Sequence, residues 1–93
     1  MRVDLQDGFD KDRVEVYVNG VAVLAEEGVT SRRTLGFALS SEIEVAPGPV
    51  ELEIRIPTRN LSKTFSVDTP NLGISIRNGD IEIITSGKRF GYA

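Results

Sequence analysis

Four aspartates stand close together in the run VDLQDGFDKDR near the start of the chain: Asp4, Asp7, Asp10 and Asp12. Because calcium prefers oxygen ligands, Asp7, Asp10 and Asp12 are the candidate metal ligands of this sequence. An EF-hand loop requires glycine at its sixth position and glutamate at its twelfth. Counted from Asp4, the sixth residue is Phe9. Counted from Asp7, the twelfth is Val18, so neither frame is an EF-hand.

A turn-rich polar loop explains the same residues without a metal. The pair Asp7-Gly8 is typical of a tight turn, and the side chain of Asp10 or Asp12 is suited to bond the backbone of a second turn. A calcium site assembled from several loops of a folded domain remains the alternative, with Asp7, Asp10 and Asp12 as its ligands.

Two missing residue types remove most familiar catalytic chemistry. The 93 residues include no histidine and no cysteine. The chain therefore has no imidazole base and no thiol nucleophile, which excludes serine–histidine and cysteine–histidine mechanisms. A pair of carboxylates can hydrolyse glycosides, but the paired carboxylates expected here lie on an open, solvated face. We expect a protein that is not an enzyme and that needs no cofactor, unless it binds calcium.

The charge of the chain narrows the class of partner. Eleven basic residues against fourteen acidic ones give a net charge of −3. Such a domain is poorly suited to nucleic acid or to an anionic membrane, so we expect a protein partner or self-association. No apolar run approaches the roughly 20 residues of a membrane span, and the first residues, MRVDLQDG, lack the apolar core of a signal peptide. The sequence does not fix a cellular compartment.

Apolar residues recur with a period of two along most of the chain, which is the pattern of half-buried β-strands. The clearest runs are Arg13–Val18, Phe37–Val45, Val50–Ile56, Thr64–Val67, Leu72–Ile76 and Ile81–Ile84. No window has the period of an amphipathic helix. The segment Glu26–Gly36 interrupts the alternation, and we expect it to cross between two sheets.

The turns between these runs agree with an all-β fold. Asn19-Gly20 and Asn78-Gly79 predict two-residue type I′ hairpins, and Ala46–Pro49 (APGP) predicts a four-residue turn. Seven or eight short strands at this spacing indicate a single domain over residues 1–93. We predict an antiparallel two-sheet β-sandwich, with a small β-barrel as the alternative.

The strand rhythm resembles that of immunoglobulin-like and fibronectin-like accessory domains of bacterial multidomain proteins. The sequence departs from true immunoglobulin domains, because it lacks their cysteine pair and core tryptophan. The resemblance implies an accessory or spacer role, but folds of this kind carry many functions.

Pairing the strands across Ala46–Pro49 predicts a ladder of acidic side chains on the face away from the core. In this register Glu44 lies opposite Glu51, and Glu42 lies opposite Glu53. Directly opposed like charges destabilise a strand pair by up to about 1 kcal/mol each. This acidic ladder therefore needs water, neighbouring arginines, a cation or a basic partner to offset the repulsion.

The first hairpin predicts an apolar strip on its polar face. With Asn19-Gly20 as the turn, Tyr17 lies opposite Ala22, and Glu15 lies opposite Leu24. Tyr17, Ala22 and Leu24 would then form a strip that marks an interaction surface if nothing covers it.

These observations favour a non-catalytic interaction or accessory module, either in contact with a protein partner or acting as a spacer within a larger assembly. A calcium- or carbohydrate-binding module is the alternative.

Overall fold

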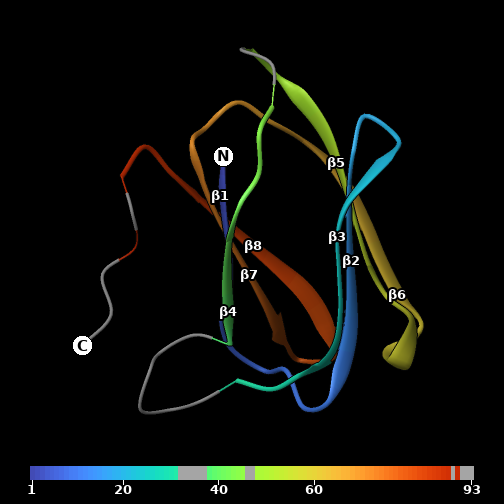
Figure 1. Cartoon of the computed structure of the whole chain (residues 1–93). Coiled ribbons are helices and arrows are strands. Elements are labelled where there is room, and N and C mark those ends of the chain that lie inside the picture. The colour runs from blue at the N-terminus through green and yellow to red at the C-terminus, as the bar shows by residue number, and fades with distance from the viewer. Residues whose placement is uncertain (32–37, 46–47, 89, 91–93) are drawn as a thin grey trace.

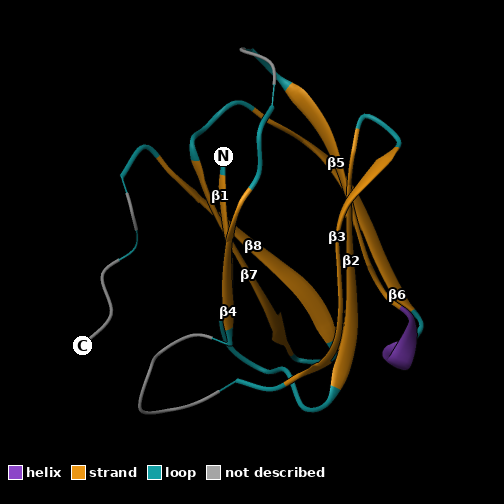
Figure 2. Cartoon of the chain, in the orientation of Figure 1, coloured by secondary structure: helices purple, strands orange, loops and turns teal. Residues whose placement is uncertain are grey.

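A computed structural model describes residues 1–31, 38–45, 48–88 and 90, which form two packed β-sheets (Figure 1, Figure 2). The described elements are β1 (Arg2–Leu5), β2 (Asp12–Val18), β3 (Val21–Val29), β4 (Leu39–Glu42), β5 (Val50–Ile56), the 3₁₀ turn η1 (Pro57–Arg59), β6 (Leu61–Val67), β7 (Asn71–Arg77) and β8 (Asp80–Ser86). The first sheet has the strand order β4-β1-β7-β8, and the second sheet has the order β3-β2-β5-β6.

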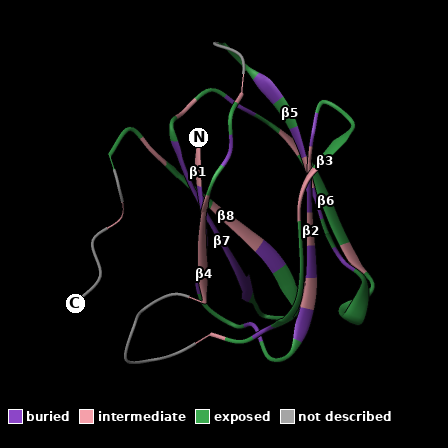
Figure 3. Cartoon of the chain, viewed as in Figure 1, coloured by how far each residue is buried: buried purple, intermediate pink, exposed green. Residues whose placement is uncertain are grey.

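The core lies between the two sheets and is built from the side chains that alternate inwards along each strand (Figure 3). From the first sheet it includes Val3, Leu5, Leu72, Ile74, Ile76 and Ile81. From the second sheet it includes Val14, Val16, Val18, Val50, Leu52, Ile54, Ile56 and Val67. The described strands form two separate sheets that are not closed into a barrel, so the predicted β-sandwich is confirmed.

Both Asn-Gly hairpins form as predicted. Asn19 and Gly20 have φ values of 48° and 83°, and Asn78 and Gly79 have φ values of 53° and 75°. Positive φ at both central residues is the signature of a type I′ turn, which matches the twist of the strands it joins. These turns fix the β2–β3 and β7–β8 pairs.

The chain forms a strand where the sequence predicted only a polar loop. β1 lies between β4 and β7, and it runs parallel to β7, unlike the other described strand pairs. Val3 and Leu5 enter the core at 1% and 0% exposure. Two apolar residues are too few to establish a period of two among aspartates, which is why the pattern did not reveal this strand.

The predicted pairing across Ala46–Pro49 is wrong, because β4 and β5 lie in different sheets. β4 pairs with β1 instead, and Ile43 N–H donates to the Met1 carbonyl oxygen just beyond β4. The connection from β4 to β5 is therefore an arch between the layers. Ala46 and Pro47 of that arch lie outside the described residues.

The acidic ladder consequently does not form. Glu42 lies opposite Arg2 on β1 and 3.3 Å from the N-terminal ammonium group, while Glu44 lies exposed beyond the end of β4. Glu51 and Glu53 lie on β5, in the other sheet. Their partners on β6 carry hydroxyl groups, so the expected repulsion is absent.

The apolar strip is also interrupted. Tyr17 pairs with Ala22 as predicted. A β-bulge then shifts the register by one residue, so Leu24 pairs with Val16 rather than with Glu15. Because one extra residue moves the following side chains to the opposite face, Leu24 packs against the core. Tyr17 and Ala22 keep their place on the outer face.

The expected crossover Glu26–Gly36 is described only at its start. β3 extends to Val29, which is buried, and residues 32–37 lie outside the described part of the chain. The predicted strand Phe37–Val45 is observed as the shorter β4, and Phe37 itself lies outside the described residues.

Gly8 provides a test of how tightly the β1–β2 connection packs. It has a φ of 87°, and a Cβ placed on it would lie 2.0 Å from the Ile76 carbonyl oxygen. We expect Gly8→Ala to lower the free energy of unfolding by more than about 3 kcal/mol, from backbone strain plus the clash. Gly20 is the matched control, since it has a φ of 83° but open space around it.

Gly20→Ala should cost only about 1–2 kcal/mol, the strain of the left-handed backbone alone. Urea unfolding of both variants measures the difference. Equal losses would show that the Gly8 connection yields easily and is not a fixed part of the fold.

Candidate functional site

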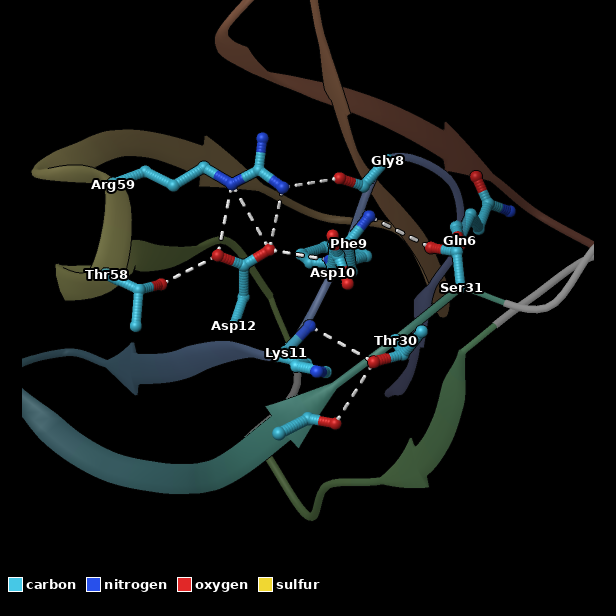
Figure 4. Close-up of polar contacts among 11 residues, drawn as sticks. Gln6, Gly8, Phe9, Asp10, Lys11, Asp12, Thr30, Ser31, Thr58 and Arg59 are labelled. Atoms are coloured by element: carbon cyan, nitrogen blue, oxygen red, sulfur yellow. Dashed lines mark hydrogen bonds and ion pairs between the residues drawn. The ribbon is translucent and has the colours of Figure 1, made fainter.

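Asp12, near the end of the aspartate-rich run, is a buried carboxylate that pairs with the partly exposed Arg59 (Figure 4). It lies at the start of β2 and is 2% exposed. Its carboxylate accepts hydrogen bonds from Arg59 Nε at 3.0 Å and Arg59 Nη2 at 2.9 Å. The Thr58 hydroxyl at 2.7 Å and the Asp10 backbone N–H at 2.9 Å complete the set.

Arg59 reaches this position because η1 turns the chain between β5 and β6. Pro57 starts the 3₁₀ turn with the φ such a turn requires, and Asn60 ends it in the left-handed conformation. Arg59 Nη2 also donates to the Gly8 carbonyl oxygen at 2.8 Å. One guanidinium group therefore ties the η1 turn both to the start of β2 and to the loop before it.

The end of β3 holds the same loop from the other side (Figure 4). The Ser31 hydroxyl donates to the Gln6 carbonyl oxygen at 2.6 Å and accepts from Phe9 N–H at 3.0 Å. Lys11 N–H donates to the Thr30 hydroxyl oxygen at 3.1 Å. The loop is thus fixed by side chains from two distant segments, which is a structural role.

The electrostatics of Asp12 agree with that role. Burial acts to raise its pKa, but hydrogen bonds from Arg59, the Asp10 N–H and Thr58 outweigh the burial. The net effect holds the pKa of Asp12 below its ordinary value of 3.8. In the same pair the Asp12 carboxylate raises the pKa of Arg59. Asp12 is thus an anion already neutralised by a guanidinium group.

The structure does not gather the three predicted calcium ligands. Asp7 pairs with Arg77 at 3.3 Å, Asp10 is exposed, and Asp12 is engaged by Arg59. Within residues 1–31, 38–45, 48–88 and 90, no three acidic side chains lie together as a metal-binding group. Calcium binding at Asp7, Asp10 and Asp12 stays a prediction, which the second experiment below tests.

Asp4 takes a position that the sequence did not reveal. It is 0% exposed, although it lies on the face of β1 that points away from the core. Its carboxylate accepts hydrogen bonds from Ser40 at 2.6 Å and Arg2 at 3.0 Å. On the neighbouring strand, Gly73 leaves room for the Gln6 side chain, which a Cβ would meet at 2.7 Å. This polar face of the first sheet is packed.

The outer face of the second sheet carries a different arrangement, centred on a tyrosine and an arginine. Arg55 on β5 lies with its guanidinium carbon 4.5 Å from the centre of the Tyr17 ring on β2. Glu53, directly opposite Tyr17, accepts from Arg55 Nε at 3.0 Å. Glu15, directly opposite Arg55, accepts from the Tyr17 hydroxyl at 2.9 Å. We call Glu15, Tyr17, Glu53 and Arg55 the Tyr17–Arg55 cluster.

Charge pairing fixes the protonation of this cluster. The hydrogen bond to Glu15 raises the pKa of the Tyr17 hydroxyl. Bonds from Arg13 and then Tyr17 lower the pKa of Glu15. The bond to Glu53 raises the pKa of Arg55. Around neutral pH Glu15 is therefore ionised, the Tyr17 hydroxyl is neutral, and Arg55 is a cation. The outer face thus presents a neutral phenol beside a guanidinium cation.

A shallow groove of about 410 Å³ borders the cluster where η1 joins β6. Its lining is Glu53, Arg55, Pro57, Asn60, Leu61 and Ser62. Arg55 and Glu53 belong to both the groove and the cluster. The sequence placed Tyr17 and Ala22 on this outer face, but it missed Arg55 as their neighbour, because the β2–β5 pairing joins strands far apart in the chain.

The chain matches no protein-family model, and neither the curated proteins nor the solved structures compared with it give a match. The described residues also contain no helix that is long and apolar enough to cross a membrane. The function is therefore inferred from the geometry of the described side chains.

The Asp12–Arg59 pair predicts how stability depends on pH. A depressed carboxyl pKa stabilises the fold above its unfolded value, and that contribution is lost as the pH falls through the folded pKa. We expect Asp12→Asn to lower the free energy of unfolding by about 2 kcal/mol near neutral pH, less than for a fully buried pair since Arg59 stays partly exposed.

As the pH falls through the folded pKa of Asp12, which lies below 3.8, the wild type and Asp12→Asn should converge, because the wild-type carboxyl becomes protonated. Urea unfolding across this pH range measures the gap. Asp10→Asn is the matched control, as it removes the same charge from an exposed site two residues earlier in the chain. A gap that persists unchanged at low pH would rule out the ion pair as its source.

The calcium alternative has its own test. We expect millimolar calcium to leave the melting temperature unchanged relative to EDTA, since Asp12, the buried carboxylate of the three, is already bonded to Arg59. A site with a Kd 100-fold below the added calcium would contribute about 2.7 kcal/mol. For a domain of this size that is a rise of roughly 10–20 °C. A rise of that order would establish calcium binding, and Asp7→Asn and Asp10→Asn would then locate it.

Proposed function

We propose that this domain is a non-catalytic protein-interaction module, and that a partner protein binds the outer face of the second sheet at the Tyr17–Arg55 cluster. The observation that carries the proposal is the stacking of Arg55 on the Tyr17 ring, 4.5 Å apart, on an outward face of the sheet. Tyrosine and arginine are the residue types that most often dominate binding energy at protein interfaces.

The rigidity of the cluster supports this role. Tyr17 and Arg55 lie on the two central strands of their sheet, and each is held by a carboxylate two residues away on its own strand. Side chains fixed before binding lose little conformational entropy when a partner arrives. A solvated surface arginine without such partners would have to be ordered on binding, at a cost in affinity.

The charges of this face indicate the chemistry of the partner. Around the cluster the outer face carries the glutamates Glu15, Glu27, Glu51 and Glu53 and the arginines Arg13 and Arg55. Arg13 is paired with both Glu15 and Glu27. The excess of carboxylates favours a partner with basic groups around an apolar or aromatic centre that packs on Tyr17.

A carbohydrate-binding role is less well supported. Sugar rings stack on bare aromatic faces, whereas one face of the Tyr17 ring is covered by Arg55. A pure spacer role would place no requirement on Tyr17 or Arg55, and the following experiment separates it from the interaction role.

The test uses a photo-crosslinking residue at Ala22, which lies exposed beside Tyr17. We expect a discrete crosslinked protein from a lysate of the source organism, and we expect Tyr17→Ala and Arg55→Ala to abolish it. With the captured partner purified, Tyr17→Ala should weaken binding at least tenfold, the loss of about 1.4 kcal/mol or more.

The matched controls are Thr85→Ala, an exposed residue of the other sheet, and the same crosslinker placed at Lys88. Thr85→Ala should leave the crosslinked product unchanged. The crosslinker at Lys88 should not yield that product. Equal crosslinking from both positions, or equal affinity of the Tyr17→Ala and wild-type proteins, would exclude this face as the binding surface.

A further inference from the structure

The two described sheets have four strand edges. Two of them are poorly suited to pair with another strand, and a third, β8, has its outward backbone groups covered at one residue. β4 is only four residues long, and β3 is distorted by two register shifts. On β8, Ile81 is covered on both its backbone groups. Its N–H donates to Asp80 Oδ1 at 2.8 Å, and its carbonyl oxygen accepts from Lys63 Nζ at 3.1 Å. Short strands and bulges are usual ways of blocking an edge, and covered backbone groups cannot pair with another strand.

β6 is the remaining edge, and it is long and regular. All seven residues of Leu61–Val67 pair with β5 without a register shift. No strand that the structure describes lies beyond it in the second sheet. It contains no proline, and its lysine, Lys63, is on the inner side and bonds the Ile81 carbonyl oxygen, so the outer side of β6 carries no charge.

The pattern of hydrogen bonds identifies which β6 groups face outwards. The Glu51 carbonyl oxygen accepts from Asn19 N–H, so Glu51 points towards β2. In an antiparallel ladder, alternate residues direct both backbone groups to opposite sides. The alternate β5 residues Leu52, Ile54 and Ile56 therefore bond β6 through Phe65, Lys63 and Leu61. Ser62, Thr64 and Ser66 direct their N–H and carbonyl groups to the open edge.

We propose that β6 pairs antiparallel with β6 of a second copy of this chain, with Thr64 on the two-fold axis. Thr64 then faces the partner's Thr64, and Ser62 faces the partner's Ser66. Each of these three residues directs both backbone groups to the edge, so the register forms six backbone hydrogen bonds. The result is a continuous eight-stranded sheet with isologous symmetry.

The side chains of β6 are self-complementary in this register. On the outer face hydroxyl groups meet hydroxyl groups, a favourable cross-strand combination. On the inner side Lys63 lies opposite the partner's Phe65, so the methylene stem of the lysine packs beside an aromatic ring while its ammonium group bonds the Ile81 carbonyl oxygen. Leu61 meets the partner's Val67. Moving the axis by one residue to Lys63 would oppose two lysines. Moving it to Phe65 would leave Ser62 without a partner inside β6, so the register centred on Thr64 is the one that pairs all three outward residues.

This inference goes beyond the proposed function, because it concerns the strand edge and a different partner. Pairing would join the outer faces of two second sheets and place two Tyr17–Arg55 clusters on one surface. A partner with two contact sites would then bind more tightly than either cluster alone allows. The two proposals can be tested independently, because Tyr17 lies on β2 and not on the β6 edge.

The experiment is sedimentation of the full chain up to about 1 mM, the upper range for a weak edge contact. We expect a monomer–dimer equilibrium. Ser62→Glu/Ser66→Glu and Ser62→Lys/Ser66→Lys each oppose like charges at two places across the axis, and each should weaken dimerisation at least about tenfold. A mixture of the two variants opposes unlike charges and should restore the dimer.

The glutamate and lysine double variants should change the contacts between β6 and β5 to a similar extent. Position 62 lies opposite Arg55 and position 66 opposite Glu51, so each double variant creates one attractive and one repulsive contact with β5. Their melting temperatures should therefore be similar. Tyr17→Ala should leave the dimer unchanged, which separates this test from that of the proposed function.

A wild-type chain that stays monomeric over the whole concentration range would overturn the inference. So would a dimer that neither double variant weakens, since its contact would then lie elsewhere. Dimerisation of the separate variants without any gain on mixing would show that β6 pairs in another register or with another strand.

Discussion

The bond between Asp12 and Arg59 closes the end of the sandwich where the chain passes from the first sheet to the second. Asp12 begins β2, Arg59 ends the η1 turn between β5 and β6, and Gly8 lies in the loop that crosses between the layers. Breaking this bond would leave a buried carboxylate without its cation, which costs several times more than losing an exposed pair. The position of η1, and hence the groove beside Arg55, depends on it.

Structural features that depend on neighbouring residues could be predicted from the sequence, whereas features that depend on the pairing of distant strands could not. Asn-Gly turns and the alternation of Val50–Ile56 depend on neighbouring residues, and both were correctly predicted. The arch after β4 looked like a hairpin because proline and glycine also suit an arch. Whether the chain forms a hairpin or an arch here depends on whether β4 pairs more favourably with β1 or with β5. That competition involves residues about forty positions apart, and no local pattern reports it.

The candidate site likewise combines a feature that the sequence predicts with features that depend on strand pairing. The sequence placed Tyr17 on the outer face, since Val16 and Val18 must face the core. It predicted Leu24 beside Tyr17 because a regular hairpin would put it there. The bulge turned Leu24 inwards and left Arg55, from β5, as the neighbour of Tyr17. A bulge inserts one residue at a small energetic cost, so inspection of the alternation alone does not locate it.

The composition of β6 differs from what edge protection alone would select. An edge that must stay solvated is most simply blocked by charged side chains, by proline or by a bulge. The outward residues of β6 are instead Ser62, Thr64 and Ser66, which are small, uncharged and able to hydrogen-bond a copy of themselves. The one β6 cation, Lys63, protects the β8 edge behind it. Among the described strands, β6 is thus a regular edge whose outward side chains are complementary to a copy of themselves. A two-fold contact between two β6 strands uses both of these edges at once, which favours a closed dimer over unrestricted aggregation.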